Sequence, residues 1–168
     1  MSGFRLPWLV FAVLPLVATC GDDEPSGPAT SFSAVLSGDE EVPAVVTSAT
    51  GNATLEISGS AITYTITVAN LLNPVVSHIH IAPEGVNGPV RLNLCGTAET
   101  PACAVGDGVL VTGTNGAVDP AITFDQLVEA MRTGNAYVNV HTNDGVGQPN
   151  SGPGDMQSGE IRGQIVAD

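Results

Sequence analysis

The three histidines of this 168-residue chain lie in two short segments with the pattern of β-strands. His78 and His80 are two residues apart, and side chains two apart in a strand leave the same face of a sheet. His141 ends the run Tyr137-Val-Asn-Val-His141, in which valines alternate with polar or aromatic side chains. We therefore expect all three imidazoles on the outer side of their strands, opposite the core.

Two imidazoles from one strand and a third from a neighbouring strand would make an open metal site. Three nitrogens hold the ion in such a site, and water takes the remaining position. The candidate ions are copper and zinc, which suit imidazole ligands. The alternative is that His78, His80 and His141 are outward polar residues, hydrogen-bonded to their neighbours. Both interpretations stand until the order of the strands is known.

Other polar residues share these outer faces. Tyr137 and Asn139 alternate with the valines that precede His141, and we assign them a structural or supporting role. Glu160 and Arg162 leave one face of the last expected strand together. The simplest interpretation is a structural pairing, with neighbours across the sheet or with each other, and an exposed pair of this kind contributes about 0–1 kcal/mol. The alternative is that Glu160 accepts an N–H hydrogen bond from a histidine ligand.

The elements that would position these residues are short strands. The clearest expected strand covers residues 61–69, where isoleucine, tyrosine and valine alternate with threonine. Ser58-Gly59-Ser60 suits a tight hairpin before it. Similar but shorter patterns predict strands at 32–36, 53–57, 75–82, 89–94, 108–113, 136–142 and 159–166.

One short helix interrupts the strands. Thr123 and Gln126 have the spacing of a capping box, and the apolar residues that follow recur at helical spacing up to Met131. Gly134 is a suitable end. About eight strands and one helix predict an all-β fold, either an antiparallel β-sandwich or a flattened Greek-key barrel.

Net charge excludes two classes of partner. The chain carries 17 acidic and 4 basic residues, a formal net charge of −13 at pH 7. Few cations are available to neutralise a row of phosphates, so we expect no nucleic-acid partner. The same argument excludes an electrostatic grip on anionic lipid head groups.

The N-terminal segment has the features of an export signal. Residues 1–19 contain Arg5 and then an apolar run too short to span a bilayer. Thr19-Cys20 and the acidic residues after it resemble a bacterial lipobox, in which Cys20 receives lipid, although Thr19 departs from the usual Gly, Ala or Ser. We expect a lipoprotein signal peptide and a flexible acidic tether over 20–31, with the β domain over 32–168.

This interpretation places the protein outside the cytoplasm. Lipid on Cys20 would be its sole contact with the membrane, with the domain facing the periplasm or the cell surface. A cleaved secretory peptide and an uncleaved anchor are the alternatives, and without lipid on Cys20 the protein would be secreted. The other two cysteines, Cys95 and Cys103, enclose a seven-residue loop and are expected to form a disulfide in an oxidising compartment. A metal pair is the alternative for them.

Two further segments carry oxygen ligands. Asp39, Glu40 and Glu41 form a charge run that we interpret as a solvated turn, with weak calcium binding as the alternative. The segment from Asn143 to Ser158 lacks the spacing of an EF-hand, and its length favours a binding loop.

Several of these segments together resemble the CHRD domain, a module named after chordin. They include Phe32-Ser-Ala-Val-Leu-Ser-Gly-Asp-Glu-Glu-Val-Pro43, Thr50-Gly-Asn-Ala-Thr-Leu55, His78-Ile-His80, Gly85-Val-Asn-Gly-Pro-Val90, Tyr137-Val-Asn-Val-His-Thr142 and Gly159-Glu-Ile-Arg-Gly-Gln-Ile165. The resemblance covers about residues 31–167. The long segment after Thr142 and the loop between the two later cysteines depart from the family pattern.

The resemblance implies an extracellular β-rich module, of immunoglobulin-like or barrel type. Chordin sequesters growth factors, but function belongs to sites and not to folds, so that role is not carried over. The region also resembles copper–zinc superoxide dismutase, which places H-x-H on a barrel strand. That enzyme needs more histidines than the three present here, and an acidic chain repels superoxide.

Motifs of known enzyme classes are absent from the sequence, including GxSxG, the Walker loop and HExxH. We therefore expect a non-catalytic binding or structural module, exported and lipid-anchored, with a protein or polysaccharide partner of unknown identity. The alternative is a copper- or zinc-binding protein that uses His78, His80 and His141.

Overall fold

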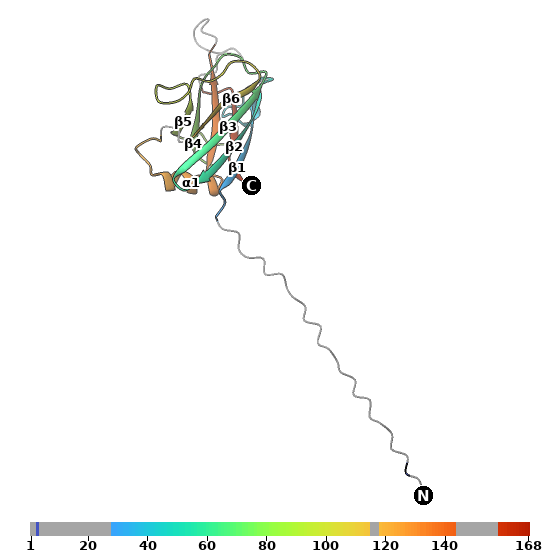
Figure 1. The fold of residues 1–168 in the computed structure, drawn as a ribbon. Helices are drawn as coiled ribbons and strands as arrows, with labels where there is room; N and C mark the ends of the chain where they lie inside the picture. Colours follow the sequence, from blue (N-terminus) through green and yellow to red (C-terminus); the bar gives the residue numbers. More distant parts are fainter. Residues whose placement is uncertain (1–2, 4–27, 115–117, 144–157) are drawn as a thin grey trace.

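A computed structural model describes residue 3 and residues 28–114, 118–143 and 158–168 (Figure 1). Within these ranges the chain forms nine strands, one α-helix and one 3-10 turn, which confirms the all-β prediction. The elements are β1 (Ser31–Ser37), η1 (Gly38–Glu40), β2 (Thr50–Ser58), β3 (Ala61–Ala69), β4 (Pro74–Ile81), β5 (Val90–Cys95), β6 (Gly108–Thr114), α1 (Phe124–Arg132), β7 (Ala136–Thr142), β8 (Ile161–Gln164) and β9 (Val166–Ala167).

The strands make one antiparallel sheet that curls until it is nearly closed into a barrel (Figure 1). Their order is β5-β4-β7-β8-β1-β2-β3-β6, with β9 beside β1. Both β1 and β7 run antiparallel to β8, so these two strands point in the same direction. The prediction of a flattened barrel is confirmed, and the order places β4 directly beside β7.

Alternation along each strand builds the core. On β3, Tyr64 and Ile66 face the barrel interior, while Thr63 and Thr65 face outward and lie within 3.3 Å of threonine hydroxyls on β6. Gly59 supplies the positive φ of 60° in the turn between β2 and β3. The interior is filled by apolar side chains from the sheet, among them Phe32, Leu36, Leu55, Ile79, Leu92, Val138, Val140, Ile161 and Ile165.

The helix α1 packs against the same core. Thr123 and Gln126 form the reciprocal capping box that their spacing predicts. Leu127 and Met131 are fully buried, and Gly134 follows the helix with a φ of 68°. In Figure 1, α1 lies at the end of the barrel where β1 begins.

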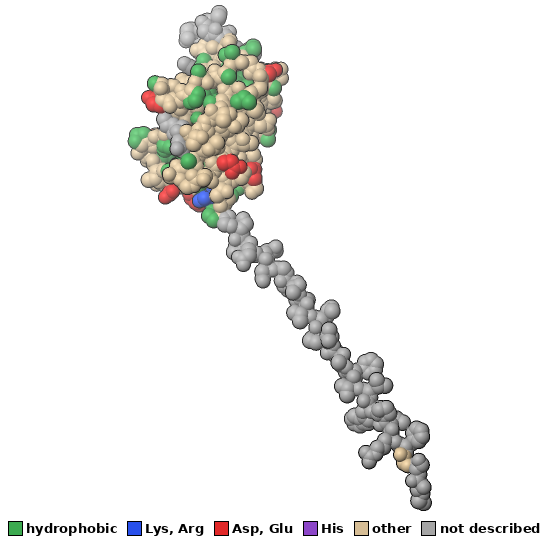
Figure 2. All heavy atoms as spheres, viewed as in Figure 1, with side chains coloured by type: hydrophobic (Ala, Val, Ile, Leu, Met, Phe, Trp, Pro, Cys, Tyr) green, Lys and Arg blue, Asp and Glu red, His purple; other side chains and the backbone are tan. Residues whose placement is uncertain are grey.

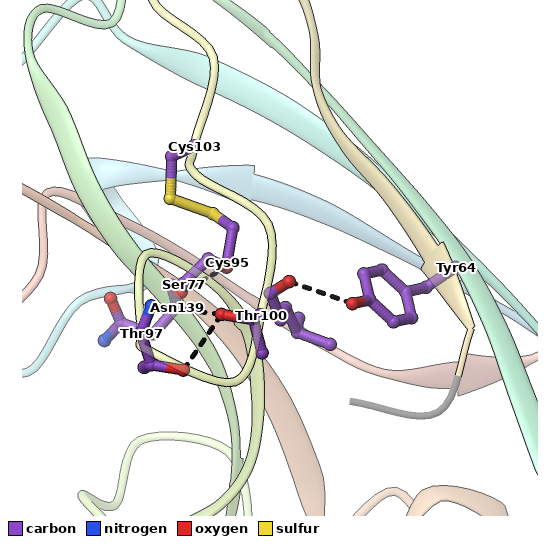
Figure 3. Close-up of a disulfide and its surroundings, with 8 residues drawn as sticks. Tyr64, Ser77, Cys95, Thr97, Thr100, Cys103 and Asn139 are labelled. Atoms are coloured by element: carbon purple, nitrogen blue, oxygen red, sulfur yellow. Dashed lines mark hydrogen bonds between the residues drawn. A yellow bond between two sulfur atoms is a disulfide. The ribbon is translucent and has the colours of Figure 1, made fainter. Parts of the chain in front are cut away.

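The two edge strands, β5 and β6, meet at a gap that we call the seam. The Tyr64 hydroxyl donates to the Leu94 carbonyl at 2.9 Å and so joins β3 to β5 across the seam (Figure 3). The predicted disulfide joins Cys95, at the end of β5, to Cys103 in the loop that leads to β6. These contacts tie β5 to β3 and to the loop before β6, at the place where β5 and β6 share no continuous ladder.

Some predicted boundaries shift. The strand β1 begins at Ser31, one residue inside the expected tether, and the last strand is split at Ile165 into β8 and β9. The expected signal peptide, Cys20 and most of the tether lie outside the described residues, as does most of the loop from Asn143 to Ser158. No helix in the described part of the chain is long and apolar enough to cross a membrane.

Candidate metal centre

The three histidines come from adjacent antiparallel strands. On β4 and β7, His78 pairs with Asn139 and His80 pairs with Tyr137, and the same register places His141 opposite Val76. The alternate residues of both strands, such as Ile79, fill the core. The period of two therefore places the imidazoles on the side predicted from the sequence.

The histidine side chains also converge. One candidate ligand atom from each of His78, His80 and His141 lies within 4.8 Å of the other two. The ring centroid of His78 lies 5.6 Å from that of His80 and 5.2 Å from that of His141. The sequence suggested this cluster only on condition that the strands were neighbours, and that condition is met.

The outer face around the histidines is not open to solvent. His80 is 8% exposed, and Tyr137, Asn139, Glu160 and Arg162 are all less exposed than that. Two loops are tied to this face: residues 38–49, which we call the Glu41 segment, and residues 82–89, which we call the strap. The fold therefore buries a polar layer on the side of the sheet opposite the apolar core.

The strap fixes the protonation of His80. The Nδ1 atom of His80 lies 2.9 Å from the Gly88 carbonyl, and because a carbonyl can only accept, Nδ1 must carry the hydrogen. Nε2 is then left with a lone pair, and it is buried without a hydrogen-bond partner among the described residues. This is the form in which histidine binds a metal.

His78 also has a buried ring nitrogen, Nδ1, without a hydrogen-bond partner in the described part of the chain. Burial, reinforced by His141 and His80, lowers the pKa of His78 to about 4. Burial likewise lowers the pKa of His80. Both imidazoles are therefore neutral at pH 7, as a metal ligand requires.

A stack of three side chains supports His80. The Tyr137 ring lies parallel to the His80 ring, with centroids 4.7 Å apart, and the Arg162 guanidinium lies 3.4 Å from the centroid of Tyr137. The Tyr137 hydroxyl accepts the Gly88 N–H at 3.1 Å. Gly88 thus contacts both rings through its two backbone polar groups.

Arg162 holds the strap in place. Its guanidinium donates to the Val86 carbonyl at 3.0 Å and to the Asn87 side chain at 3.3 Å. Arg162 is 1% exposed. Among the described residues, the salt bridge found is that of Arg91 with Asp119, and Arg162 takes no part in it. The two loops therefore bury both Glu160 and Arg162, and Arg162 has the strap as its partner.

Glu160 serves a different set of contacts. Its two carboxylate oxygens accept hydrogen bonds from Thr47 at 2.6 Å and from Thr142 at 2.7 Å. It thereby ties the Glu41 segment to the end of β7. A hydrogen bond from a histidine ligand to Glu160 remains a prediction.

Glu41 is a buried acid that the sequence did not predict. Asp39 and Glu40 are exposed, but Glu41 is 4% exposed, and its Oε2 atom accepts a hydrogen bond from the Asn139 amide at 3.3 Å. Burial raises the pKa of Glu41 to about 7, although Arg162 and Asn139 act in the opposite direction. The prediction of a solvated turn is wrong for this residue. Nothing in the charge run distinguishes Glu41 from Glu40.

Comparison with known proteins adds one finding about the domain. A family model described as the CHRD domain matches residues 32–152, which confirms the resemblance seen in the sequence motifs. The matched range contains all three histidines and Glu41. A search of curated proteins found no match.

Proposed function

Because this chain belongs to the CHRD domain family, we propose that it is an exported, non-catalytic binding module whose ligand is a copper or zinc ion. The ligands are His78, His80 and His141. The observation that carries this proposal is the convergence of three imidazole nitrogens within 4.8 Å of one another.

Unpaired polar atoms support a missing cation at this position. Nearly all buried polar groups in proteins have a hydrogen-bond partner, so the exceptions point to an absent ligand or water. His78 Nδ1 and His80 Nε2 are such exceptions within the described ranges. A metal ion would accept the lone pairs of both nitrogens and remove the cost of burying them.

The geometry needs only a small contraction. Three nitrogens bound at about 2.0–2.1 Å to one ion lie roughly 3.3 Å from one another. Binding would shorten the present separations of up to 4.8 Å through rotation of the three side chains. The ligand set is nitrogen alone and neutral, and Cu(II) binds such a set more tightly than Zn(II) does. Water would occupy the open position of the ion.

Export and lipid anchoring form part of the same proposal. They are supported by the sequence of residues 1–20, with its apolar run before Cys20. The disulfide between Cys95 and Cys103 is compatible with an oxidising compartment. Mass spectrometry of the protein purified from membranes should detect diacylated Cys20 as the first residue.

Metal content tests the site directly. The purified protein, made without a histidine tag, is loaded with Cu(II) or Zn(II), dialysed, and assayed for bound metal. We expect about one ion per chain, and loss of that ion in His78→Ala, His80→Ala and His141→Ala. Thr65→Ala changes the exposed face of β3, away from the cluster, and should retain the ion.

Two outcomes would reject the metal site. One is a wild-type protein that retains no ion, and the other is an ion that survives all three histidine substitutions. Either result would favour a module that binds a protein or polysaccharide through another surface.

A further inference from the structure

The side chains of Glu41 and Asn139 are hydrogen-bonded to each other, but two of their oxygen atoms have no hydrogen-bond donor among the described residues. The Asn139 amide donates to Oε2 of Glu41, but Oε1 of Glu41 and Oδ1 of Asn139 are both buried and without a partner among the described residues. Both oxygens face Gly159, where an added Cβ would clash with each of them. Both atoms are acceptors near the same glycine, and a proton on Oε1 would give them a hydrogen to share.

We propose that Glu41 carries a proton in the metal-free protein and releases it when the three-histidine site takes up a divalent ion. This inference rests on the proposed function, because it describes how that site is regulated. The exchange balances in charge and atoms: the Glu41 carboxyl O–H bond breaks, the proton leaves to water, and the new carboxylate offsets part of the added positive charge.

The position of Glu41 suits this role. Asn139, its partner on β7, lies directly across from His78 on β4, so the Asn139 side chain links the carboxyl to the strand position opposite a ligand. A divalent ion in this poorly solvated layer favours the ionised carboxyl. Burial, which raises the pKa of Glu41 to about 7, makes the proton available near neutral pH.

The other charged groups described around Glu41 are not expected to release the proton in its place. Arg162 on β8 faces it and is a fixed cation. Glu160 receives hydrogen bonds from two threonines, and His78 and His141 belong to the site itself. On its own segment, Asp39 and Glu40 are solvent-exposed. Among the carboxyl groups in the described part of the chain, Glu41 is the one whose pKa is raised.

Proton release per bound ion is the direct test. Cu(II) is titrated calorimetrically into the purified protein at pH 6.5, in two buffers that differ in ionisation enthalpy. We expect the wild type to release up to one proton more per ion than Glu41→Gln. Its apparent affinity should rise more steeply with pH, by up to about tenfold per pH unit below pH 7. Glu40→Gln, the exposed neighbour, should behave as the wild type.

The Gln variant is chosen because it mimics the protonated acid. Its amide donates to Asn139 Oδ1 and accepts from the Asn139 amide, so the pair is kept while the titration is removed. Equal proton release by wild type and Glu41→Gln would overturn the inference and leave the metal site standing. Absence of Cu(II) binding in the wild type would overturn both.

A second measurement avoids substitution altogether. The infrared C=O band of a protonated carboxyl should be present in the wild-type protein at pH 6 and should disappear when Cu(II) is added. If Glu41→Gln fails to fold, a band that persists in the Cu(II)-loaded wild type is the result that overturns the inference.

Discussion

Asn139 is hydrogen-bonded to Glu41 and lies opposite His78, and burial shifts the pKa values of Glu41 and His78 in opposite directions. The pKa of Glu41 rises from 4.5 to about 7, and that of His78 falls from 6.5 to about 4. Folding therefore favours the protonated acid and the neutral imidazole. The contribution of Glu41 is complete below pH 4.5 and is lost as pH rises through about 7. The contribution of His78 is complete above pH 6.5 and is lost as pH falls through about 4.

Glu41→Gln isolates the first of these effects. Glutamine cannot ionise, so the variant should gain stability relative to the wild type as pH rises from 4.5 to 7. We expect a relative gain on the order of 2 kcal/mol in the free energy of unfolding. Urea unfolding of both proteins across this range measures it. Curves that run parallel with pH would contradict the assignment.

Residue types and spacing alone were enough to predict which histidines share a face. The alternation of His78 and His80 with buried Ile79 follows from strand geometry. The cover over that face was not predictable, because the strap and the Glu41 segment have no period that reports what they touch. For that reason the burial of Arg162 and Glu41 appeared only in the structure.

At the scale of elements, the strap is the part that prepares the site. Gly88 lies so close to the end of β4 that a Cβ there would clash with the Ile81 carbonyl oxygen. Its own carbonyl accepts the hydrogen of His80 Nδ1. The close approach of the strap and the orientation of His80 therefore depend on the same glycine.

Gly88→Ala should weaken metal binding more than it weakens the fold. The added methyl group displaces the strap, and His80 loses the acceptor that fixes its tautomer. We expect Cu(II) affinity to fall by about 10–100-fold, the usual effect of losing the partner of a ligand histidine. Competition with a chelator measures the affinity. Val86→Ala, at an exposed strap position, serves as the control, and equal affinities in the two variants would reject this role of Gly88.

At the scale of the whole molecule, the barrel depends on how its seam is held. Strand ranges were predicted well because each strand alternates locally, as over residues 61–69. The order of the strands was not, because pairs such as β1 with β8 join distant parts of the chain. The Tyr64 hydroxyl then joins β3 to β5, and the disulfide ties the end of β5 to the loop that leads to β6 (Figure 3).

Removing the disulfide should destabilise the domain without affecting the site. Cys95 and Cys103 are eight positions apart, and the loop-entropy relation gives about 2–3 kcal/mol for a ring of this size. The Cys95→Ala/Cys103→Ala variant should lose about that much free energy of unfolding and still bind Cu(II). A reductant should destabilise the wild type and leave the variant unchanged. A wild type that is insensitive to reductant would contradict the prediction.

The net negative charge of the chain favours the approach of the proposed ligand, which is a cation. Figure 2 shows acidic side chains spread over one face of the domain, with little positive charge among them. A net charge of −13 raises the local concentration of cations and repels anions, most strongly at low salt.

Because β1 and β7 point in the same direction, the start of β1 and the end of β7 lie at opposite ends of the barrel. The chain enters β1 at Ser31 at one end, and β7 carries His141 toward the other. A domain attached through Cys20, as proposed, would be held at the first end, with His141 toward the opposite end. Exchange of the proposed ion with the surrounding fluid would then need no release of the domain from the membrane.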